Sequence, residues 1–210
     1  MHTHYHSTHL ISNCTSVTLV CMKHHENVKI IAFVGLTGSG KSTAVEYLTQ
    51  KGYPKVYFGG IVLDEVTKRG LELTQENEQP IREELREKEG KDFVVKRIVE
   101  QLHHLIGAGQ HRIVADGLYT WTEYKTLKHE FPGELTVVAV VSPKHLRKQR
   151  MAKRPIRPLT STEVDQRDWA EIENIEKGGP IAIADYYLMN DRDVNHLHTQ
   201  IDDVLEHIDF

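Results

Sequence analysis

The sequence predicts an α/β protein of three layers, in which a five-stranded parallel sheet is covered by helices on both faces. Two observations predict this fold. Short apolar runs alternate with helical stretches along most of the 210 residues, and the first run leads at once into a glycine-rich loop. The composition, 39% hydrophobic and 27% charged, is that of a globular domain. A net charge of −4 argues against a broad nucleic-acid surface, and no apolar run approaches the length that spans a membrane.

Five segments are predicted as strands. The segment 29–34 (KIIAFV) is an apolar run that ends at a glycine, and 135–141 (LTVVAVV) is the most β-branched stretch of the chain. Such runs are typical of strands buried in a parallel sheet. The other three are 54–58, 112–115 and 186–189. Helical stretches separate these strands, so the connections are crossovers and the strands are expected to run parallel.

Helices are predicted between the strands. One follows the glycine-rich loop at 41–51. Another begins after Ser142-Pro143, a cap followed by a proline at the first helical position, and is predicted to run to Arg154. A helix at 162–177 is predicted to end at Gly178-Gly179-Pro180. The remaining predicted helices are 61–69, 78–89, 92–106, 122–129 and 194–208.

Residues 1–27 differ from the rest of the chain, because they hold six of the fourteen histidines and both cysteines, Cys14 and Cys21. We interpret them as a disordered tail or an upstream extension of the reading frame, with Met22 as a natural start. A metal-binding tract is the alternative, since imidazole and thiolate bind zinc or nickel. Two cysteines provide no disulfide framework and no basic signal region precedes them, so we expect a reducing, cytoplasmic compartment. The domain itself is predicted to span 28–210.

The loop after the first strand reads GLTGSGKS and matches the phosphate-binding motif G-x-x-x-x-G-K-[ST] in full. Glycines let backbone N–H groups turn toward a phosphate chain, and the helix that follows directs its positive end there. Lys41 is placed to reach the β- and γ-phosphates, and the Ser42 hydroxyl to bind Mg²⁺. The motif predicts a P-loop NTPase fold that binds ATP and Mg²⁺. The nucleotide-binding residues are expected to be Gly35, Leu36, Thr37, Gly38, Ser39, Gly40, Lys41, Ser42 and Thr43.

Ligands of parallel sheets bind at the carboxyl ends of the strands, and two further features lie there. Asp116 follows the third strand, where a carboxylate can hold Mg²⁺ or its water shell; a helix cap or loop residue is the alternative. Seven cations and no acid occupy 144–157. From this run Arg150, Arg154 and Arg157 are predicted to stabilise phosphate charge from a closing lid. The alternatives are a solvated basic face or contact with a nucleic-acid backbone.

These residues resemble small P-loop kinases, most closely the adenylate kinase and dephospho-CoA kinase group. The resemblance rests on GLTGSGKST, on ADG at 115–117, on the arginine-rich helix and on IAIADYYLMN at 181–190, and it covers 28–208. Within the group the chain is most similar to a branch that shares YPKVYFGGIV, RGLELTQEN, LREKEGKDF and QRD. The resemblance implies an acceptor-binding helical region at about 59–107, a lid at about 150–168, and adenine near Asp185.

The resemblance also locates departures on the acceptor side. Related sequences carry an acid at the position of Gly60 and arginines at the positions of Leu63 and Tyr119, groups that hold or activate the acceptor. Asp64, one helical turn on from Gly60, is expected to take the place of the acid.

The function predicted from these features is transfer of the γ-phosphate of Mg-ATP to a nucleotide-like small molecule, of the nucleoside monophosphate or dephospho-CoA type. The catalytic residues are then Lys41, Arg150, Arg154, Arg157 and Asp64. Expected partners are the small-molecule acceptor but neither nucleic acid nor membrane, with the chain acting as a monomer or homodimer. A nucleotide-dependent regulatory ATPase with slow hydrolysis is one alternative, which the acceptor-side departures favour. A kinase acting on nucleic-acid ends is the other.

Overall fold

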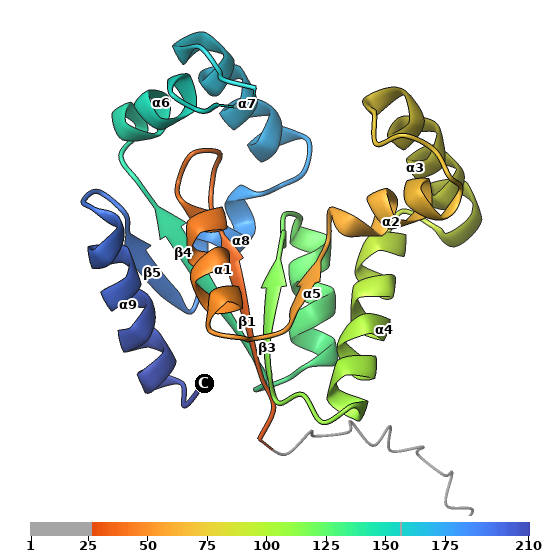
Figure 1. The fold of residues 1–210 in the computed structure, drawn as a ribbon, viewed down its shortest axis with the longest axis horizontal. Coiled ribbons are helices and arrows are strands. Elements are labelled where there is room, and N and C mark those ends of the chain that lie inside the picture. Colours follow the sequence, from red (N-terminus) through yellow and green to blue (C-terminus); the bar gives the residue numbers. More distant parts are fainter. Residues whose placement is uncertain (1–26, 156) are drawn as a thin grey trace, which may run out of the picture.

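Five parallel strands form one sheet in the order β2-β3-β1-β4-β5 (Figure 1). The structure, a computed structural model, describes residues 27–155 and 157–210, so the predicted histidine-rich tail lies outside the described residues except for residue 27. The strands are β1 (Lys29–Val34), β2 (Lys55–Tyr57), β3 (Arg112–Asp116), β4 (Leu135–Val141) and β5 (Tyr186–Met189). All five predicted strands are therefore confirmed. Because β1 lies between β3 and β4, the loop after β1 stands where the strand order reverses, which is where such sheets bind ligands.

Helices connect the strands and cover both faces of the sheet (Figure 1). The longer ones are α1 (Lys41–Gln50), α2 (Gly60–Lys68), α3 (Gln75–Glu89), α4 (Phe93–Gly107), α5 (Trp121–Glu130), α6 (Lys144–Ala152), α7 (Ser161–Glu173) and α9 (Val194–His207), and α8 (Gly178–Ala182) is short. Among the described residues, no helix is both long and apolar enough to cross a membrane. Figure 1 shows α6 and α7 at the upper left, beyond the carboxyl ends of the strands, and α3 at the upper right.

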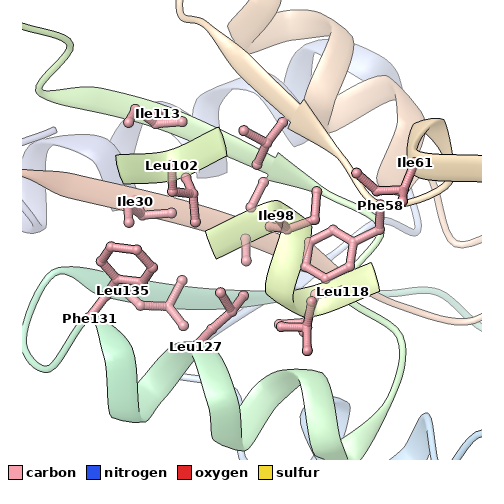
Figure 2. Packing of buried hydrophobic residues seen from close by; sticks show 14 of the residues in the cluster. Ile30, Phe58, Ile61, Ile98, Leu102, Ile113, Leu118, Leu127, Phe131 and Leu135 are labelled. Carbon is pink, nitrogen blue, oxygen red and sulfur yellow. The ribbon is translucent and has the colours of Figure 1, made fainter. Parts of the chain in front are cut away.

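The period of two along β1 divides the core into two layers. Ile30, Ala32 and Val34 belong to the cluster that includes residues of α4 and α5, whereas Ile31 and Phe33 belong to the cluster built with α1 and α9. Figure 2 shows the first cluster, in which Ile98 and Leu102 of α4 lie with Ile30 and Ile113, and Leu127 and Phe131 lie on the α5 side. A strand buried on both faces explains why KIIAFV is continuously apolar rather than alternating.

Two of the predicted helix ends are wrong. The helix after Pro143 ends at Ala152 instead of Arg154, because a residue before a proline is disfavoured in the α conformation and Pro155 follows. The helix predicted to reach residue 177 ends at Glu173, and Glu176 has a φ of +55°, which no α-helix accommodates.

The segment Gly178-Gly179-Pro180 does not merely stop a helix, as predicted, but forms most of α8. Pro180 is tolerated there because it lies in the first turn, where a backbone N–H has no partner within the helix.

The helix α7, which overlaps the predicted lid region, begins with a capping motif. Thr160 accepts a hydrogen bond from the Glu163 backbone N–H, and the Glu163 side chain accepts one from the Thr160 N–H, which makes a capping box.

Candidate active site

The loop between β1 and α1 depends on two glycines that lie against other parts of the chain. Gly40 has a φ of +102°, and a Cβ there would stand 2.1 Å from Nδ2 of Asn190. That amide donates a 2.8 Å hydrogen bond to the carbonyl oxygen of Ser39, so the residue after β5 supports the loop. Gly38 has a φ of +79°, and its Cβ would stand 3.0 Å from the carbonyl oxygen of Arg147 in α6. Only glycine fits this backbone and these close approaches.

A cavity of about 1050 Å³ lies over this loop. Its walls include the whole of 35–43, Asp116 at the end of β3, and Arg150, Arg154 and Arg157 beyond β4. The structure therefore brings together the phosphate loop, the strand-end carboxylate and the three arginines, which the sequence analysis identified separately. The charged side chains lining the described part of the cavity are six cations and two acids: Lys41, Arg150, Arg154, Arg157, Arg167 and Lys177, with Asp116 and Glu171. Such a surplus of cations suits a phosphate-rich ligand.

Lys41 is held at the floor of the cavity by Asp116. Its Nζ lies 2.8 Å from Oδ1 of Asp116, and Nζ of Lys55 lies 3.8 Å from Oδ2 of the same carboxylate. Burial alone lowers the pKa of the Lys41 ammonium, but its neighbours Tyr119 and Asp116, the second an ionised carboxylate that accepts its hydrogen bond, outweigh burial and raise the pKa above its usual value. Lys41 is therefore a permanent cation beside the phosphate loop at neutral pH.

The residues that would hold Mg²⁺ fit that ion. Ser42 lies exposed in the first turn of α1, and it lines the same cavity as the carboxylate of Asp116. Both offer hard oxygen atoms, which Mg²⁺ prefers, and Mg²⁺ usually takes few ligands from the protein and completes its shell with phosphates and water. Within 27–155 and 157–210, no group of three or more His, Cys, Asp or Glu forms a metal site on its own. A metal here would therefore depend on the bound phosphates.

The arginines of the basic run divide into two kinds. Arg147 is 5% exposed and makes a bidentate ion pair with Asp168 of α7, with distances of 2.8 and 2.7 Å. Its Nη1 also donates to the carbonyl oxygen of Thr37 in the loop, at 3.1 Å. Arg150 donates to Oγ of Ser142 and to the carbonyl oxygen of Asn190. By contrast, both Arg154 and Arg157 are exposed at the cavity wall.

The spacing of Arg147, Arg150 and Arg154 predicts one shared face. The structure separates Arg147 from this set, because its guanidinium is buried against Asp168 and is not part of the cavity wall. Arg147 thus joins α6, α7 and the loop into one unit, while Arg150 and Arg154 line the cavity.

A second contact joins α7 to the loop. Glu171 accepts a 2.8 Å hydrogen bond from Oγ1 of Thr37, a 3.2 Å hydrogen bond from Nε of Arg167, and a 2.8 Å hydrogen bond from Nζ of Lys177. Burial alone raises the pKa of Glu171, but the charge of Lys177 and the three donors outweigh burial and hold the pKa below its ordinary value. Glu171 is therefore ionised at neutral pH, although its side chain is only 12% exposed.

Lys177 and Glu171 are cavity residues that the sequence analysis missed. Lys177 follows no motif and lies in the connection between α7 and α8, and Glu171 lies on α7 just past the QRD segment. Tyr57, at the end of β2, also lines the cavity and was not singled out. A residue at a strand end is a weak signal for Tyr57, but no pattern in the sequence indicates that Lys177 returns to the loop.

Two predicted site residues are not brought to this cavity. Asp64 is an exposed residue of α2 and is not part of the described cavity wall. Asp185 lies at the amino end of β5, whereas the phosphate loop lies at the carboxyl end of β1. Its Oδ2 accepts hydrogen bonds from the Val137 N–H at 2.7 Å and from Nζ of Lys128 at 2.8 Å. Asp185 thus joins β5 to β4 and α5, because an unpaired strand N–H at that position needs an acceptor.

The structure also shows what surrounds two of the acceptor-side positions that depart from related sequences, Gly60 and Tyr119. The ring of Tyr57 lies across the start of α2, since a Cβ at Gly59 would stand 2.5 Å from its hydroxyl and one at Gly60 3.1 Å from its ring. A side chain at Gly60 would therefore meet this ring. Tyr119 lines the cavity and lies between two cations, with its ring centre 5.4 Å from Nζ of Lys41 and 4.7 Å from Nζ of Lys177.

Residues 31–175 match the family described as AAA domain. A UPF0200 protein of Thermococcus onnurineus is 35% identical over 182 residues, which cover 85% of this chain and 97% of that protein. Similarity therefore extends across nearly the whole of the relative, and it includes the phosphate loop and the segments that surround the cavity.

Solved structures of low sequence identity share the fold. A shikimate kinase from Bacteroides thetaiotaomicron has a TM-score of 0.53 at 13% identity, over 87% of this chain and 99% of that one. A gluconokinase from Sinorhizobium meliloti has a TM-score of 0.52 at 17% identity, over 86% of this chain and 95% of that one. At these identities the likeness concerns the fold alone. The predicted P-loop NTPase fold is confirmed, and its structural neighbours include small-molecule kinases.

Proposed function

The chain belongs to the UPF0200 family and carries an AAA domain, and from this premise we propose that it transfers the γ-phosphate of Mg-ATP to a small molecule. One observation carries the proposal: a single cavity is lined by the phosphate loop, the carboxylate of Asp116 and three arginines from beyond β4. A phosphate loop alone would serve any nucleotide-binding protein. Arginines across the cavity from the loop are the groups that stabilise charge during phosphoryl transfer.

Several of the lining groups have specific roles in this proposal. Lys41 and the backbone of the loop hold the β- and γ-phosphates, and Ser42 and Asp116 hold Mg²⁺, which neutralises phosphate charge when it is bound. Arg154 and Arg157, which are exposed at the cavity wall, contact the phosphates. These groups act by positioning and by electrostatic stabilisation, since phosphoryl transfer requires little covalent participation by the protein.

Transfer of the γ-phosphoryl group requires no reagent besides ATP and the acceptor. An acceptor oxygen forms a bond to the γ-phosphorus while the bond from that phosphorus to the β–γ bridging oxygen breaks, and ADP leaves with the electron pair. When the acceptor is a hydroxyl, its proton passes to water. Asp64 does not line the described cavity, and Asp116 is already paired with Lys41 at 2.8 Å and assigned to Mg²⁺, so neither carboxylate is assigned as the base.

The acceptor belongs on the side of the cavity formed by Tyr57, Asp116 and Tyr119, at the ends of β2 and β3. A nucleotide-like acceptor is our first candidate, as the resemblance to adenylate kinases and dephospho-CoA kinases suggests. The shikimate kinase and gluconokinase among the structural neighbours add hydroxylated carboxylic acids as a second class.

The experiment is to measure ADP production from Mg-ATP by the full chain. Acceptors are added one at a time: AMP, CMP, UMP, dephospho-CoA, shikimate, gluconate and a 5′-hydroxyl oligonucleotide. Lys41→Ala removes the lysine of the loop. Lys51→Ala is the matched control, because Lys51 is the C-terminal cap residue of α1, which Lys41 begins, and is paired with Asp202 at the surface.

One acceptor that raises ADP production well above the rate without acceptor, with loss in Lys41→Ala and not in Lys51→Ala, establishes a kinase and its substrate class. If wild-type protein fails to bind Mg-ATP, the proposal is wrong at its root.

A nucleotide-dependent switch with slow hydrolysis is the second candidate. It is favoured by Gly60, Leu63 and Tyr119, which replace charged groups of related sequences, and by the direct contact between Thr37 of the loop and Glu171 of α7. If Mg-ATP binds and changes the fluorescence of Trp169, which is 60% exposed on α7, while no acceptor raises turnover, the switch is the better account.

A further inference from the structure

Lys177 is an unusually enclosed cation for a cavity wall. Its side chain is 4% exposed, yet it lines the same cavity as the phosphate loop. Nζ lies 2.8 Å from Oε2 of Glu171 and 4.7 Å from the centre of the Tyr119 ring. A lysine is rarely buried so far unless it is paired, and this one is paired with a carboxylate that two other groups share.

Charge around Lys177 is not balanced by the protein alone. Burial lowers the pKa of Lys177, the carboxylate of Glu171 raises it, and the nearby cations of Lys41 and Arg167 lower it, so that the pKa lies below the usual lysine value. Four cations, Lys41, Lys55, Arg167 and Lys177, are thus paired with only two carboxylates, Asp116 and Glu171. An anionic ligand beside Lys177 would supply the missing negative charge.

The position of Lys177 relative to Lys41 indicates which part of a nucleotide it would meet. Both ammonium groups approach the ring of Tyr119, at 5.4 Å for Lys41 and 4.7 Å for Lys177. Tyr119 follows the end of β3, on the acceptor side, whereas Arg150 and Asn190 lie beyond β4 and β5 on the other side of the loop. Lys177 therefore lies near the same ring as the loop lysine, on the side of the cavity where the terminal phosphate of a bound ATP is expected.

We propose that Lys177 is a second phosphate-contacting lysine of the cavity, which binds the γ-phosphoryl group and is positioned by Glu171 and Tyr119. This inference rests on the proposed function, since it assumes that the loop holds ATP. An ammonium has three donors, so one N–H remains on Glu171 while another donates to a γ-phosphoryl oxygen. Lys177 keeps its proton throughout and stabilises the charge on the phosphoryl oxygens as the bond to ADP breaks.

The test compares Mg-ADP with the Mg complex of the ATP analogue that has a β–γ imido bridge, two ligands that differ by the terminal phosphoryl group and the N–H that links it. Calorimetric titration gives both dissociation constants for wild type, Lys177→Gln and Lys177→Arg. Lys88→Gln is the matched control, because Lys88 is 67% exposed on α3 and its partner Glu84 is a neighbour on the same helix.

We expect Lys177→Gln to lose at least tenfold in affinity for the ATP analogue and less than twofold for Mg-ADP, which is the effect of one charge-assisted hydrogen bond. Lys177→Arg, which keeps the charge, should recover most of that loss. Equal weakening for both ligands, or none, overturns the inference. If wild type binds neither ligand, the proposed function itself falls, so the two failures are distinguishable.

Removing Lys177 alone leaves the carboxylate of Glu171 with fewer partners and can destabilise the fold. The double variant Lys177→Gln/Glu171→Gln removes both charges together, and thermal unfolding without ligand shows that it is folded. It should keep the selective loss for the ATP analogue. A return to wild-type affinity in the double variant would mean that Lys177 merely neutralises Glu171, which contradicts the inference.

Discussion

The hydroxyl of Thr37 in the phosphate loop donates a 2.8 Å hydrogen bond to Oε1 of Glu171 on α7, 134 residues away in the chain. The same Thr37 accepts a hydrogen bond through its carbonyl oxygen from Arg147 of α6. One loop residue thus contacts α6 and α7, at positions that flank the predicted lid of 150–168 on either side. A nucleotide entering the cavity would lie next to both contacts.

The Thr37–Glu171 contact should be measurable as a coupling energy. Thr37→Val and Glu171→Gln each weaken it, and a double-mutant cycle in urea unfolding isolates the pair from their other contacts. We expect a coupling of about 1 kcal/mol, as for a hydrogen bond to a charged group in a partly buried position. The same cycle with exposed Glu46 in place of Glu171 should give a coupling near zero.

The buried pair of Arg147 and Asp168 should be far more important for stability than the neighbouring part-buried pair of Lys148 and Asp165. Asp168→Asn leaves the Arg147 guanidinium, whose side chain is 6% exposed, without its charge partner. We expect a loss of about 3 to 5 kcal/mol in the free energy of unfolding.

Lys148→Met is the matched control, since Lys148 pairs with Asp165 between the same two helices at 2.8 Å but is 25% exposed. It should lose less than about 1 kcal/mol. Similar losses in the two variants, measured by urea unfolding, would show that the buried pair has no special weight.

Substitutions at Gly40 and Gly52 distinguish the effect of backbone strain from the effect of a close contact. Both have positive φ, at +102° and +93°, but a Cβ at Gly40 would stand 2.1 Å from Nδ2 of Asn190, and a Cβ at Gly52 meets nothing within 4 Å. Gly52→Ala should lose about 1 kcal/mol in stability and keep nucleotide binding. Gly40→Ala should lose more and abolish Mg-ATP binding, because Asn190 must move away from the loop. Unchanged affinity in Gly40→Ala would count against the loop as the phosphate site.

Glu171 should make stability depend on pH on the acid side. Its folded-state pKa lies below its ordinary value, so the unfolded chain binds more protons in that range. The stabilisation from this carboxylate is complete above roughly pH 5.5 and is lost as pH falls through the folded-state pKa. The difference in unfolding free energy between wild type and Glu171→Gln should therefore be constant near neutrality and shrink as pH falls. A difference that does not change between neutral and acid pH would contradict this.

Arg150 and Arg154 should differ in what their removal affects. Arg150 donates to Ser142 and Asn190, so Arg150→Gln should lower both the melting temperature and the affinity for Mg-ATP. Arg154 is exposed at the cavity wall, so Arg154→Gln should change stability by less than about 0.5 kcal/mol. We expect Arg154→Gln to lower the affinity of the protein for Mg-ATP about tenfold at low salt, because the variant loses one charged contact to phosphate. Unchanged affinity would remove Arg154 from the site.

Local patterns determined the fold because each depends on neighbours in the chain. The apolar run of β1, the glycine motif and the lysine that opens α1 are contiguous, and burial on both faces of a parallel sheet requires continuous hydrophobicity. The errors in the predicted helix ends arose where a single backbone torsion decides where a helix ends or begins. The positive φ of Glu176 and the tolerance of Pro180 in the first turn of α8 leave no periodic signal.

By itself, the sequence determined the parallel sheet, the phosphate loop with Lys41 and Ser42, and the strand-end position of Asp116, since short-range backbone geometry and strand order place them. Only the tertiary structure decided which charged side chains from distant elements line the cavity. It separated Arg147 from Arg150, left Asp64 and Asp185 outside the cavity, and brought Glu171 and Lys177 to the loop. The physical reason is that a charged side chain goes where a partner compensates its desolvation, and here the partners lie on elements far apart in the chain.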